Sequence, residues 1–230
     1  HLLAKLSNDS IRISPLDLKS TNENKPVPQE ILDLLKTDEY QRILKFFEET
    51  VLFFEDRNAT GIYKQVRSYA EKNGVTHRKK INIVNKETGD SEVREVFDYY
   101  EPNDPKEYVI ILTDHVSLLN PESGMDLRES INRFSEYMVM FRNRYNYIPV
   151  VIQQQNTETM GLDAFKAGKV RPTITGLGDS KYTGRDCSVM LGITNPYSHE
   201  INNYLGYDIS KFKGNIRFLE VVLNREGQSN

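Results

Sequence analysis

Two apolar runs that flank one amphipathic helical pattern, within residues 108–155, constrain the fold more than any other feature. The first run, Tyr108–Leu112, is continuously apolar and predicts a strand buried on both faces, as in parallel sheets. Ser123 and Asp126 have the spacing of a capping box ahead of the helix. The apolar stripe of that helix consists of Leu127, Ile131, Phe134, Met138, Phe141 and Tyr145. Because Pro149–Ile152 is a second strand pattern, the segment predicts a right-handed strand–helix–strand crossover.

Upstream of this unit, the sequence predicts two helices and a short strand. Residues 29–50 place apolar side chains at mostly three- and four-residue spacing, which is typical of one amphipathic helix. Val51–Phe54 has the composition of a short strand. Thr60 is the predicted N-cap of the next helix, and Asn73–Gly74 is its predicted C-cap. This alternation of helical and strand periods indicates an α/β fold.

Residues 79–100 have a different pattern, which predicts a β-hairpin inserted into the α/β scaffold. Ile81 and Ile83 alternate with polar residues, and residues 87–90 supply a turn signal. Val93–Tyr100 is then rich in residues that favour strands.

The last third of the chain begins with a glycine-rich segment, residues 156–185, which predicts loops. Ser188–Ile193 and Ile216–Leu223 predict the two final strands.

The composition excludes several classes of protein. With 38% hydrophobic and 27% charged residues, the chain has the profile of a globular protein and not of a disordered, fibrous or membrane one. The formal net charge of -3 gives no general attraction for nucleic acid, although residues 161–230 carry nine basic and seven acidic residues, a local +2. A single cysteine, Cys187, excludes an internal disulfide and predicts a reducing, cytoplasmic setting. Because the chain begins with His1 and not Met, we expect it to be part of a longer protein.

Polar residues directly follow three of the predicted strands, where ligands bind in open α/β sheets. Asp114 follows the first strand of the crossover unit, residues 153–156 (QQQN) follow the second, and Arg225 follows the last strand. An acid at such a place can hold Mg²⁺ through water, a neutral amide can sense a phosphate, and an arginine can neutralise transition-state charge. Each residue taken alone also has a structural explanation, as a turn residue, a loop residue or a surface ion pair. We interpret His115 as a packing or hydrogen-bonding residue and not a metal ligand, and Cys187 as a buried, inert thiol.

The order and spacing of these segments resemble the C-terminal ATPase domain of DnaB-type replicative DNA helicases, a RecA-like family. VIILTDHVSLL (109–119) resembles the Walker B strand of that family, and IPVVIQQQN (148–156) resembles the next strand with its phosphate-sensing glutamine. RPTITGLGDSKYTGRDCSVMLGI (171–193) resembles the DNA-facing loop and the strand after it. LEVVLNREGQSN (219–230) resembles the terminal strand and the arginine-finger segment.

Two further segments, IRISPLDLKS (11–20) and VLFFEDRNATGIYKQVRSYAEKNG (51–74), are similar to the family's sequence before Walker B, so the resemblance covers about residues 2–230. It implies a RecA-like P-loop NTPase fold, in which helices flank a mostly parallel sheet. The chain would be one domain over residues 1–230, incomplete at its N-terminus, with residues 79–100 as a hairpin insertion.

The resemblance also implies roles for individual residues. Asp114 would hold Mg²⁺ through water, Gln154 would sense the γ-phosphate of ATP, and Arg225 would be the arginine finger of a neighbouring subunit's site. The loop 176–186 would line the channel of a ring-shaped homo-hexamer around single-stranded DNA. The residues implied to contact the DNA strand are Asp179, Ser180, Lys181 and Arg185. The parent protein would thus be an ATP-dependent DNA helicase of DNA replication, with no membrane partner.

The sequence also departs from the family. No G-x-x-x-x-G-K followed by Ser or Thr occurs in the 230 residues, so the loop that cradles a triphosphate is missing, and Leu223 stands where the family has a lysine. We therefore expect this chain alone to lack ATPase activity. In the family the phosphate-loop strand lies beside the strand of Gln154, so without it we expect two unpaired sheet edges. These departures are compatible with a phage-like replication protein.

Three alternatives remain open at the level of sequence. The chain can be a non-enzymatic oligomerisation or DNA-binding module that kept the fold and lost nucleotide chemistry. It can also belong to a recombinase or a clock-type RecA-like ATPase. A metal nuclease that uses Asp114 and His115 is the least supported, because no further carboxylates cluster there.

Overall fold

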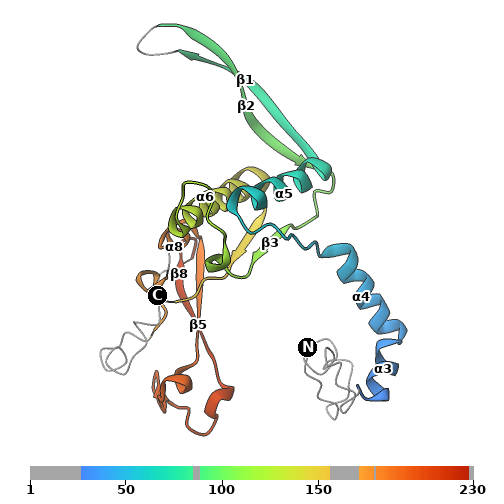
Figure 1. Cartoon of the computed structure of the whole chain (residues 1–230), viewed down its shortest axis with the longest axis vertical. Coiled ribbons are helices and arrows are strands. Elements are labelled where there is room, and N and C mark those ends of the chain that lie inside the picture. The colour runs from blue at the N-terminus through green and yellow to red at the C-terminus, as the bar shows by residue number, and fades with distance from the viewer. Residues whose placement is uncertain (1–26, 85–88, 156–170, 179, 228–230) are drawn as a thin grey trace. The chain divides into compact units, whose positions relative to one another are not determined.

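The computed structural model describes residues 27–84, 89–155, 171–178 and 180–227 (Figure 1). By its internal contacts the chain divides into two compact units, His1–Glu55 and Asp56–Asn230. That residues 1–230 are one domain of the family stays a prediction. None of the described helices combines the length and the apolar character that a bilayer crossing requires.

The described part of the first unit consists of two helices, α3 (Gln29–Leu35) and α4 (Asp38–Thr50). The single helix predicted over residues 29–50 is wrong, because Thr37 adopts an extended conformation and caps α4, its Oγ1 accepting a hydrogen bond from the backbone N–H of Tyr40 (3.4 Å). The strand predicted at Val51–Phe54 is also absent from the structure. These residues pair with no described strand, and the Phe53 side chain is 90% exposed.

The second unit begins with helix α5 (Ala59–Lys72), which buries Ala59, Val66 and Ala70. Its N-cap is Asn58, whose Oδ1 accepts a hydrogen bond from the N–H of Gly61 (2.7 Å), so the predicted N-cap Thr60 is wrong. Asn58 takes this place because it has the extended backbone of an N-cap, whereas Thr60 already lies inside the first turn. The predicted C-cap Asn73 is confirmed.

Two long strands follow, β1 (Gly74–Val84) and β2 (Ser91–Pro102), which pair antiparallel as a two-stranded ribbon (Figure 1). Gly74 lies opposite Pro102 and Val84 opposite Ser91, so the pairing extends beyond residues 79–100 at the base of the ribbon. Residues 85–88 lie outside the described part of the chain. That the ribbon is an insertion relative to the family stays a prediction.

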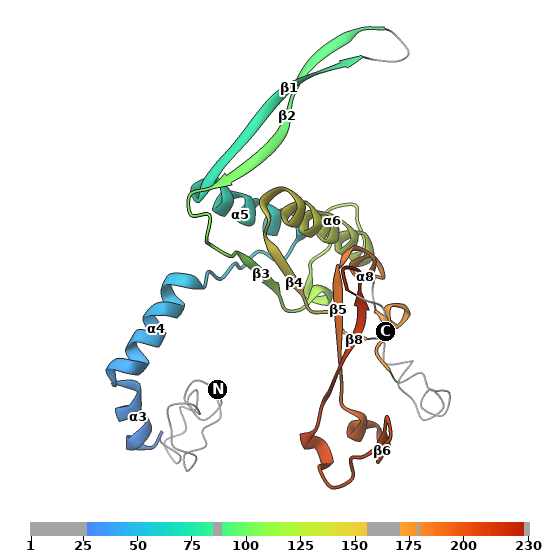
Figure 2. The same ribbon diagram turned by 180° about the vertical axis from the view of Figure 1, so that it is seen from behind.

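The predicted strand–helix–strand unit is confirmed. It consists of β3 (Ile110–Thr113), α6 (Leu127–Tyr145) and β4 (Ile148–Val151), and the two strands are parallel neighbours (Figure 2). The capping box of α6 is formed by Asp126 and Glu129, not by Ser123 and Asp126. Asp126 Oδ1 accepts from the Glu129 N–H (2.7 Å) and Glu129 Oε2 accepts from the Asp126 N–H (2.9 Å), so the helix starts one turn later than predicted.

The main hydrophobic core forms where α6 packs against α5 and one face of the β3–β4 pair. The predicted apolar stripe of α6 supplies the buried residues Ile131, Phe134, Met138, Phe141 and Tyr145. Strand β3 is not buried on both faces as predicted, because Ile111 is 8% exposed but Leu112 is 65% exposed. The helix covers only one face of this pair, so alternate side chains of β3 stay outside the core.

The remaining strands form small antiparallel pairs. Strand β5 (Val189–Thr194) pairs with β8 (Phe218–Asn224), and β6 (Asn203–Tyr204) pairs with β7 (Tyr207–Asp208). A second small core joins Ile201, Tyr204, Ile209, Ile216 and Phe218. The other described helices are the five-residue α8 (Tyr182–Asp186) and the 3-10 turns η1 (Val116–Leu118), η3 (Ile174–Gly176), η4 (Pro196–His199) and η5 (Lys213–Asn215).

The predicted mostly parallel sheet is not confirmed. The described strands form four separate two-stranded sheets, of which only β3–β4 is parallel. Strand β4 is not hydrogen-bonded to β5, and no described strand pairs with both.

Candidate functional site

Asp114 and Gln154 leave the sheet at the same edge. Strands β3 and β4 are parallel, with Thr113 opposite Val151 at their carboxyl ends. The pairing continues past both ends, because the N–H of Ile152 donates to the Thr113 carbonyl (2.9 Å) and the N–H of Val116 donates to the Ile152 carbonyl (3.1 Å). Asp114 and Gln154 are both exposed, so this edge presents a carboxylate and an amide to solvent.

Gln153, and not Gln154, connects this edge to the next segment of the chain. The Gln153 Nε2 donates to the Ser180 carbonyl (2.9 Å), and its Oε1 accepts from the hydroxyl of Thr183. The Gln154 side chain makes no hydrogen bond to any described residue, although its backbone carbonyl accepts from the N–H of Gly178 (3.2 Å). The sequence analysis placed residues 153–156 at this edge, but the resemblance gives a role to Gln154 alone, so the contacts of Gln153 were not predicted.

The period of a strand is the signal that would have identified Gln153. Side chains alternate between the two faces of a strand, so Gln153 continues the face of Val151, which packs against the core. Gln154 continues the face of Val150 and Ile152, which are 41% and 43% exposed. Gln153 is therefore half-buried and positioned to hold a neighbouring segment, as is Gln155 on the same face, whose Nε2 donates to the Arg171 carbonyl (3.4 Å).

The Ser180 side chain is bonded inside the protein, and the DNA contact implied for this residue stays a prediction. Ser180 is 2% exposed; its Oγ donates to Asn132 Oδ1 (2.6 Å) and accepts from the N–H of Tyr182 (3.1 Å). These bonds tie the start of α8 to helix α6, so the hydroxyl is used inside the protein. The predicted contact residue Asp179 lies outside the described residues.

Two predicted DNA-contacting residues are exposed here, Lys181 as the N-cap of α8 and Arg185 within the helix. The Arg185 guanidinium lies 5.5 Å from the centre of the Tyr182 ring, and Tyr182 is itself 39% exposed. This short helix is fixed to α6, because Ser135 Oγ donates to Asp186 Oδ2 (2.6 Å) and Arg142 donates to the Asp186 carbonyl (2.8 Å). The α8 segment thus exposes two cationic side chains and an aromatic ring, and its bonds to α6 hold it in place.

Arg225 directly follows β8 and is exposed. Its backbone N–H donates to the Ser188 carbonyl (2.9 Å), and its guanidinium donates to the carbonyl of Arg185. The structure therefore brings Arg225 to α8. No described hydrogen bond or ion pair joins it to Asp114 or Gln154.

Asp114 fits Mg²⁺ as a single ligand, because this ion binds through one or two carboxylates and keeps several waters or phosphate oxygens. Among the residues that the structure describes, no group of three or more histidine, cysteine, aspartate or glutamate side chains is placed to hold a metal ion. The neighbouring His115 has a buried Nδ1 without a hydrogen-bond partner in the described part of the chain. A triphosphate needs a row of backbone N–H groups, and the 230 residues contain no phosphate-loop motif to supply them. The residues present thus fit Mg²⁺ in part, but they do not fit ATP by themselves.

Cys187 is half-buried, and its Sγ donates to the carbonyl of Gly184 (3.3 Å). Burial raises the pKa of this thiol, against the opposing influence of Arg225. Because the thiolate is the reactive form, the structure agrees with the predicted inert thiol.

Glu122 links the start of α5 to α6 beside the core. Its Oε1 accepts from the N–H of Thr60 (2.7 Å), and its Oε2 accepts from the guanidinium of Arg133 (2.6 Å). Burial raises the pKa of Glu122, but the bonds from Thr60 and Arg133 outweigh it and leave the pKa below its ordinary value of 4.5.

We expect Glu122→Gln to lower the free energy of unfolding by about 1–3 kcal/mol at pH 7, because it removes the charge that these donors stabilise. A depressed pKa contributes stability above the unfolded-state pKa, and this stability is lost as the pH falls through the folded-state pKa. The difference between wild type and variant should therefore shrink below pH 4.5, as urea denaturation at several pH values would show. Glu136→Gln, at an exposed position of α6, is the control, and an equal loss there would contradict the assignment.

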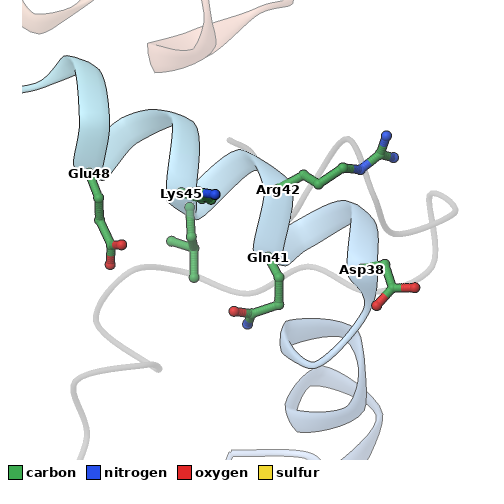
Figure 3. Close-up of a pocket in the computed structure, with 6 residues that line it drawn as sticks. Asp38, Gln41, Arg42, Lys45 and Glu48 are labelled. Atoms are coloured by element: carbon green, nitrogen blue, oxygen red, sulfur yellow. The ribbon is translucent and has the colours of Figure 1, made fainter.

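A shallow depression on α4 is lined by side chains of that single helix, among them Asp38, Arg42, Lys45 and Glu48 (Figure 3). It carries charged side chains of both signs. It contains none of the predicted site residues.

No model of a known protein family matches the sequence, and no curated protein sequence matches it. Solved structures do match the fold. The ATPase domain of a phage helicase superposes with a TM-score of 0.52 at 12% identity, over 87% of this chain and 57% of that one. A DnaB-like replicative helicase, whose structure concerns its interactions with primase, superposes with a TM-score of 0.55 at 12% identity, over 92% of this chain and 40% of that one.

The chain therefore spans about half of the length of the helicase structures that it matches. The likeness shows that the chain has the α/β fold of RecA-like helicase ATPase domains, and it confirms the resemblance to the DnaB type at the level of the fold.

Proposed function

We propose that the chain is part of the motor domain of a ring-forming replicative DNA helicase, which couples ATP hydrolysis to translocation on single-stranded DNA. The observation that carries this proposal is the hydrogen-bonded connection from the end of β4, through Gln153, to α8 with its exposed Lys181 and Arg185. Such a connection links the edge where a nucleotide would bind to a surface suited to a nucleic-acid backbone. The shared fold supports the same function.

In this proposal each residue at the sheet edge has a separate role. Asp114 holds Mg²⁺ through water, and the exposed amide of Gln154 senses the γ-phosphate. Gln153 positions α8 relative to that edge. Arg225 serves the site of the neighbouring subunit in a homo-hexamer, where its guanidinium would exchange the Arg185 carbonyl for phosphate oxygens. Bound Mg-ATP would supply the free energy that moves the subunits.

The proposed DNA surface is the exposed part of α8. Lys181 and Arg185 match the charge of a phosphate backbone, and the partly exposed Tyr182 ring offers a stacking face for a base. Contacts of this kind do not depend on base sequence, as translocation requires. Ser180 takes part only by holding the start of α8 through Asn132.

A second candidate function is a non-enzymatic module that assembles and binds DNA without turnover. The absence of a phosphate-loop motif from the 230 residues favours it for this chain. Measurements on the longer parent protein separate the candidates, since a helicase hydrolyses ATP and unwinds a duplex. A recombinase or clock-type ATPase hydrolyses ATP without unwinding, and a binding module does neither.

Single-stranded DNA binding tests the proposal on the chain itself. We expect Lys181→Ala combined with Arg185→Ala to weaken binding of a labelled oligonucleotide about tenfold at 0.1 M salt, because two phosphate contacts are lost. The slope of log K against log salt should become shallower by about 1.4, which is about 0.7 for each contact. Fluorescence anisotropy over a salt series measures both quantities.

The matched control removes an exposed arginine and lysine from α4, as Arg42→Ala with Lys45→Ala. This variant loses the same charge and should bind almost as well as wild type. If both variants lost the same affinity, the change in net charge alone would explain the loss, and α8 would be contradicted as the DNA surface.

A further inference from the structure

Both outer edges of the β1–β2 ribbon lack a partner among the strands that the structure describes. Beyond its base, every residue of 78–84 on β1 and of 91–95 on β2 is exposed, and no other described strand pairs with either strand (Figure 2). An isolated two-stranded ribbon is at best marginally stable in water, and its edges carry unpaired backbone N–H and C=O groups. Several apolar side chains are exposed on it as well, namely Ile81, Ile83, Val84 and Val93. A ribbon whose edges lack a partner and whose apolar side chains are exposed is suited to pair with another strand.

The charges of the ribbon are separated by strand. Strand β1 contains three basic residues and no acidic one, and β2 contains four acidic residues and one basic one, so their formal charges are +3 and -3 with His77 neutral. Within one ribbon these charges already attract each other. Lys79 Nζ lies 2.9 Å from Asp98 Oδ1, and Lys80 lies opposite Glu95.

This separation discriminates between the ways in which two ribbons can meet. A two-fold contact places β1 against β1 or β2 against β2, which puts like charges on adjacent strands and is unfavourable. A head-to-tail contact places the free edge of β1 against the free edge of β2 from the next copy, which puts opposite charges on adjacent strands. It also keeps the antiparallel direction that the strands have within one ribbon.

A nucleic acid is a poorer partner for this surface. The two strands together carry no net charge, and acidic side chains alternate with basic ones across the ribbon, as Lys80 and Glu95 show. Binding to a phosphate backbone requires an excess of positive charge that the ribbon does not have.

We propose that the ribbon is an interface between copies of this chain, in which the β1 edge of one copy pairs with the β2 edge of the next. A head-to-tail contact of this kind generates a ring when its rotation closes. The inference rests only on the ring assembly in the proposed function and names the surface that would mediate it. The α8 surface for DNA does not depend on it, so the two proposals fail separately.

Cross-linking between single-cysteine copies tests the interface. In a Cys187→Ser background, one copy carries Asn82→Cys on β1, and a second, ¹⁵N-labelled copy carries Val93→Cys on β2. A short bis-maleimide then joins adjacent thiols, and mass spectrometry distinguishes mixed from like pairs. We expect mixed β1–β2 products to exceed β1–β1 and β2–β2 products about tenfold, because several cross-strand charge pairs favour this arrangement. Equal yields of the three products, or a majority of like pairs, would overturn the proposal.

A charge-swapped chain tests whether charge selects the arrangement. Its six substitutions are Arg78→Glu, Lys79→Glu, Lys80→Glu, Glu92→Lys, Glu95→Lys and Asp98→Lys. The strands within one ribbon keep opposite charges, so the ribbon itself should persist. In cross-links between a swapped copy and an original copy, β1–β1 and β2–β2 products should now dominate, because the swap places opposite charges on these strands.

Two results would overturn the proposal at this step. One is an unchanged cross-linking pattern after the swap. The other combines two observations: the original chain forms no cross-links, and the Lys79→Glu, Lys80→Glu variant binds the oligonucleotide more weakly. Together they would identify the ribbon as a nucleic-acid surface. Loss of DNA binding in the Lys181 and Arg185 variant leaves these results unaffected and reports only on α8.

Discussion

Replacing Phe141 by alanine is expected to lower the free energy of unfolding by about 3–5 kcal/mol. Phe141 is 0% exposed, and its ring centre lies 5.7 Å from that of Tyr63 and 5.6 Å from that of Tyr145. Its removal leaves a cavity between α5 and α6 that the surrounding rings fill only in part. Urea denaturation followed by circular dichroism measures the loss. Phe212→Ala is the control, because that side chain is 54% exposed and should cost less than about 0.5 kcal/mol. Similar losses for the two variants would contradict the position of the core.

The second large effect is expected for Gln153→Leu. The leucine cannot accept from the Thr183 hydroxyl or donate to the Ser180 carbonyl, so polar groups of one half-buried and one buried residue lose a partner. We expect the free energy of unfolding to fall by about 2–4 kcal/mol, since each unpaired group costs about 1–3 kcal/mol. Oligonucleotide binding should weaken in the same variant, because α8 loses its attachment to β4.

Gln154→Leu provides the matched control at the next position. Its side chain bonds to no described residue, so stability and oligonucleotide binding should stay close to those of wild type. Denaturation and fluorescence anisotropy on both variants decide the matter. If Gln154→Leu caused the larger loss, the connection from β4 to α8 would be assigned to the wrong glutamine.

The sequence predicted the centre of the fold correctly because its signals there are local. The stripe from Leu127 to Tyr145 repeats with the period of a helix, and it packs on the core as expected. The parallel neighbours β3 and β4 follow from the same pattern, since two strands joined by one helix are most readily parallel.

The errors in the fold arise where non-local context decides. Val51–Phe54 has the composition of a strand but no described neighbour to pair with, so it forms no strand. The exposed face of β3 has the same cause, because a buried strand needs cover on both sides and α6 supplies only one. The helix starts were misplaced for a different reason. Asn58 and Asp126 compete with nearby residues that cap equally well, and only the backbone conformation identifies the cap.

The candidate site was predictable in outline but not in detail. The rule that parallel strands end at one edge placed Asp114 and Gln154 together, and the structure has them there. Residues 153–155 are three glutamines that differ only in the face of the strand that each continues. The resemblance gives a role to Gln154, which continues the exposed face. Ser180 matched a DNA-contacting position of the family, yet its hydroxyl bonds to Asn132, a partner 48 residues away that no local pattern indicates.

The central claim is that Asp114 and Gln154 lie on neighbouring parallel strands at one sheet edge. Spin labels on Asp114→Cys and Gln154→Cys in a Cys187→Ser chain test it most directly in solution, by the dipolar broadening of the electron paramagnetic resonance spectrum. Adjacent strands are about 4.8 Å apart, so the doubly labelled chain should show strong broadening that neither singly labelled chain has. A spectrum equal to the sum of the two single-label spectra would place these residues far apart, and would contradict both the RecA-like arrangement and the site built on it.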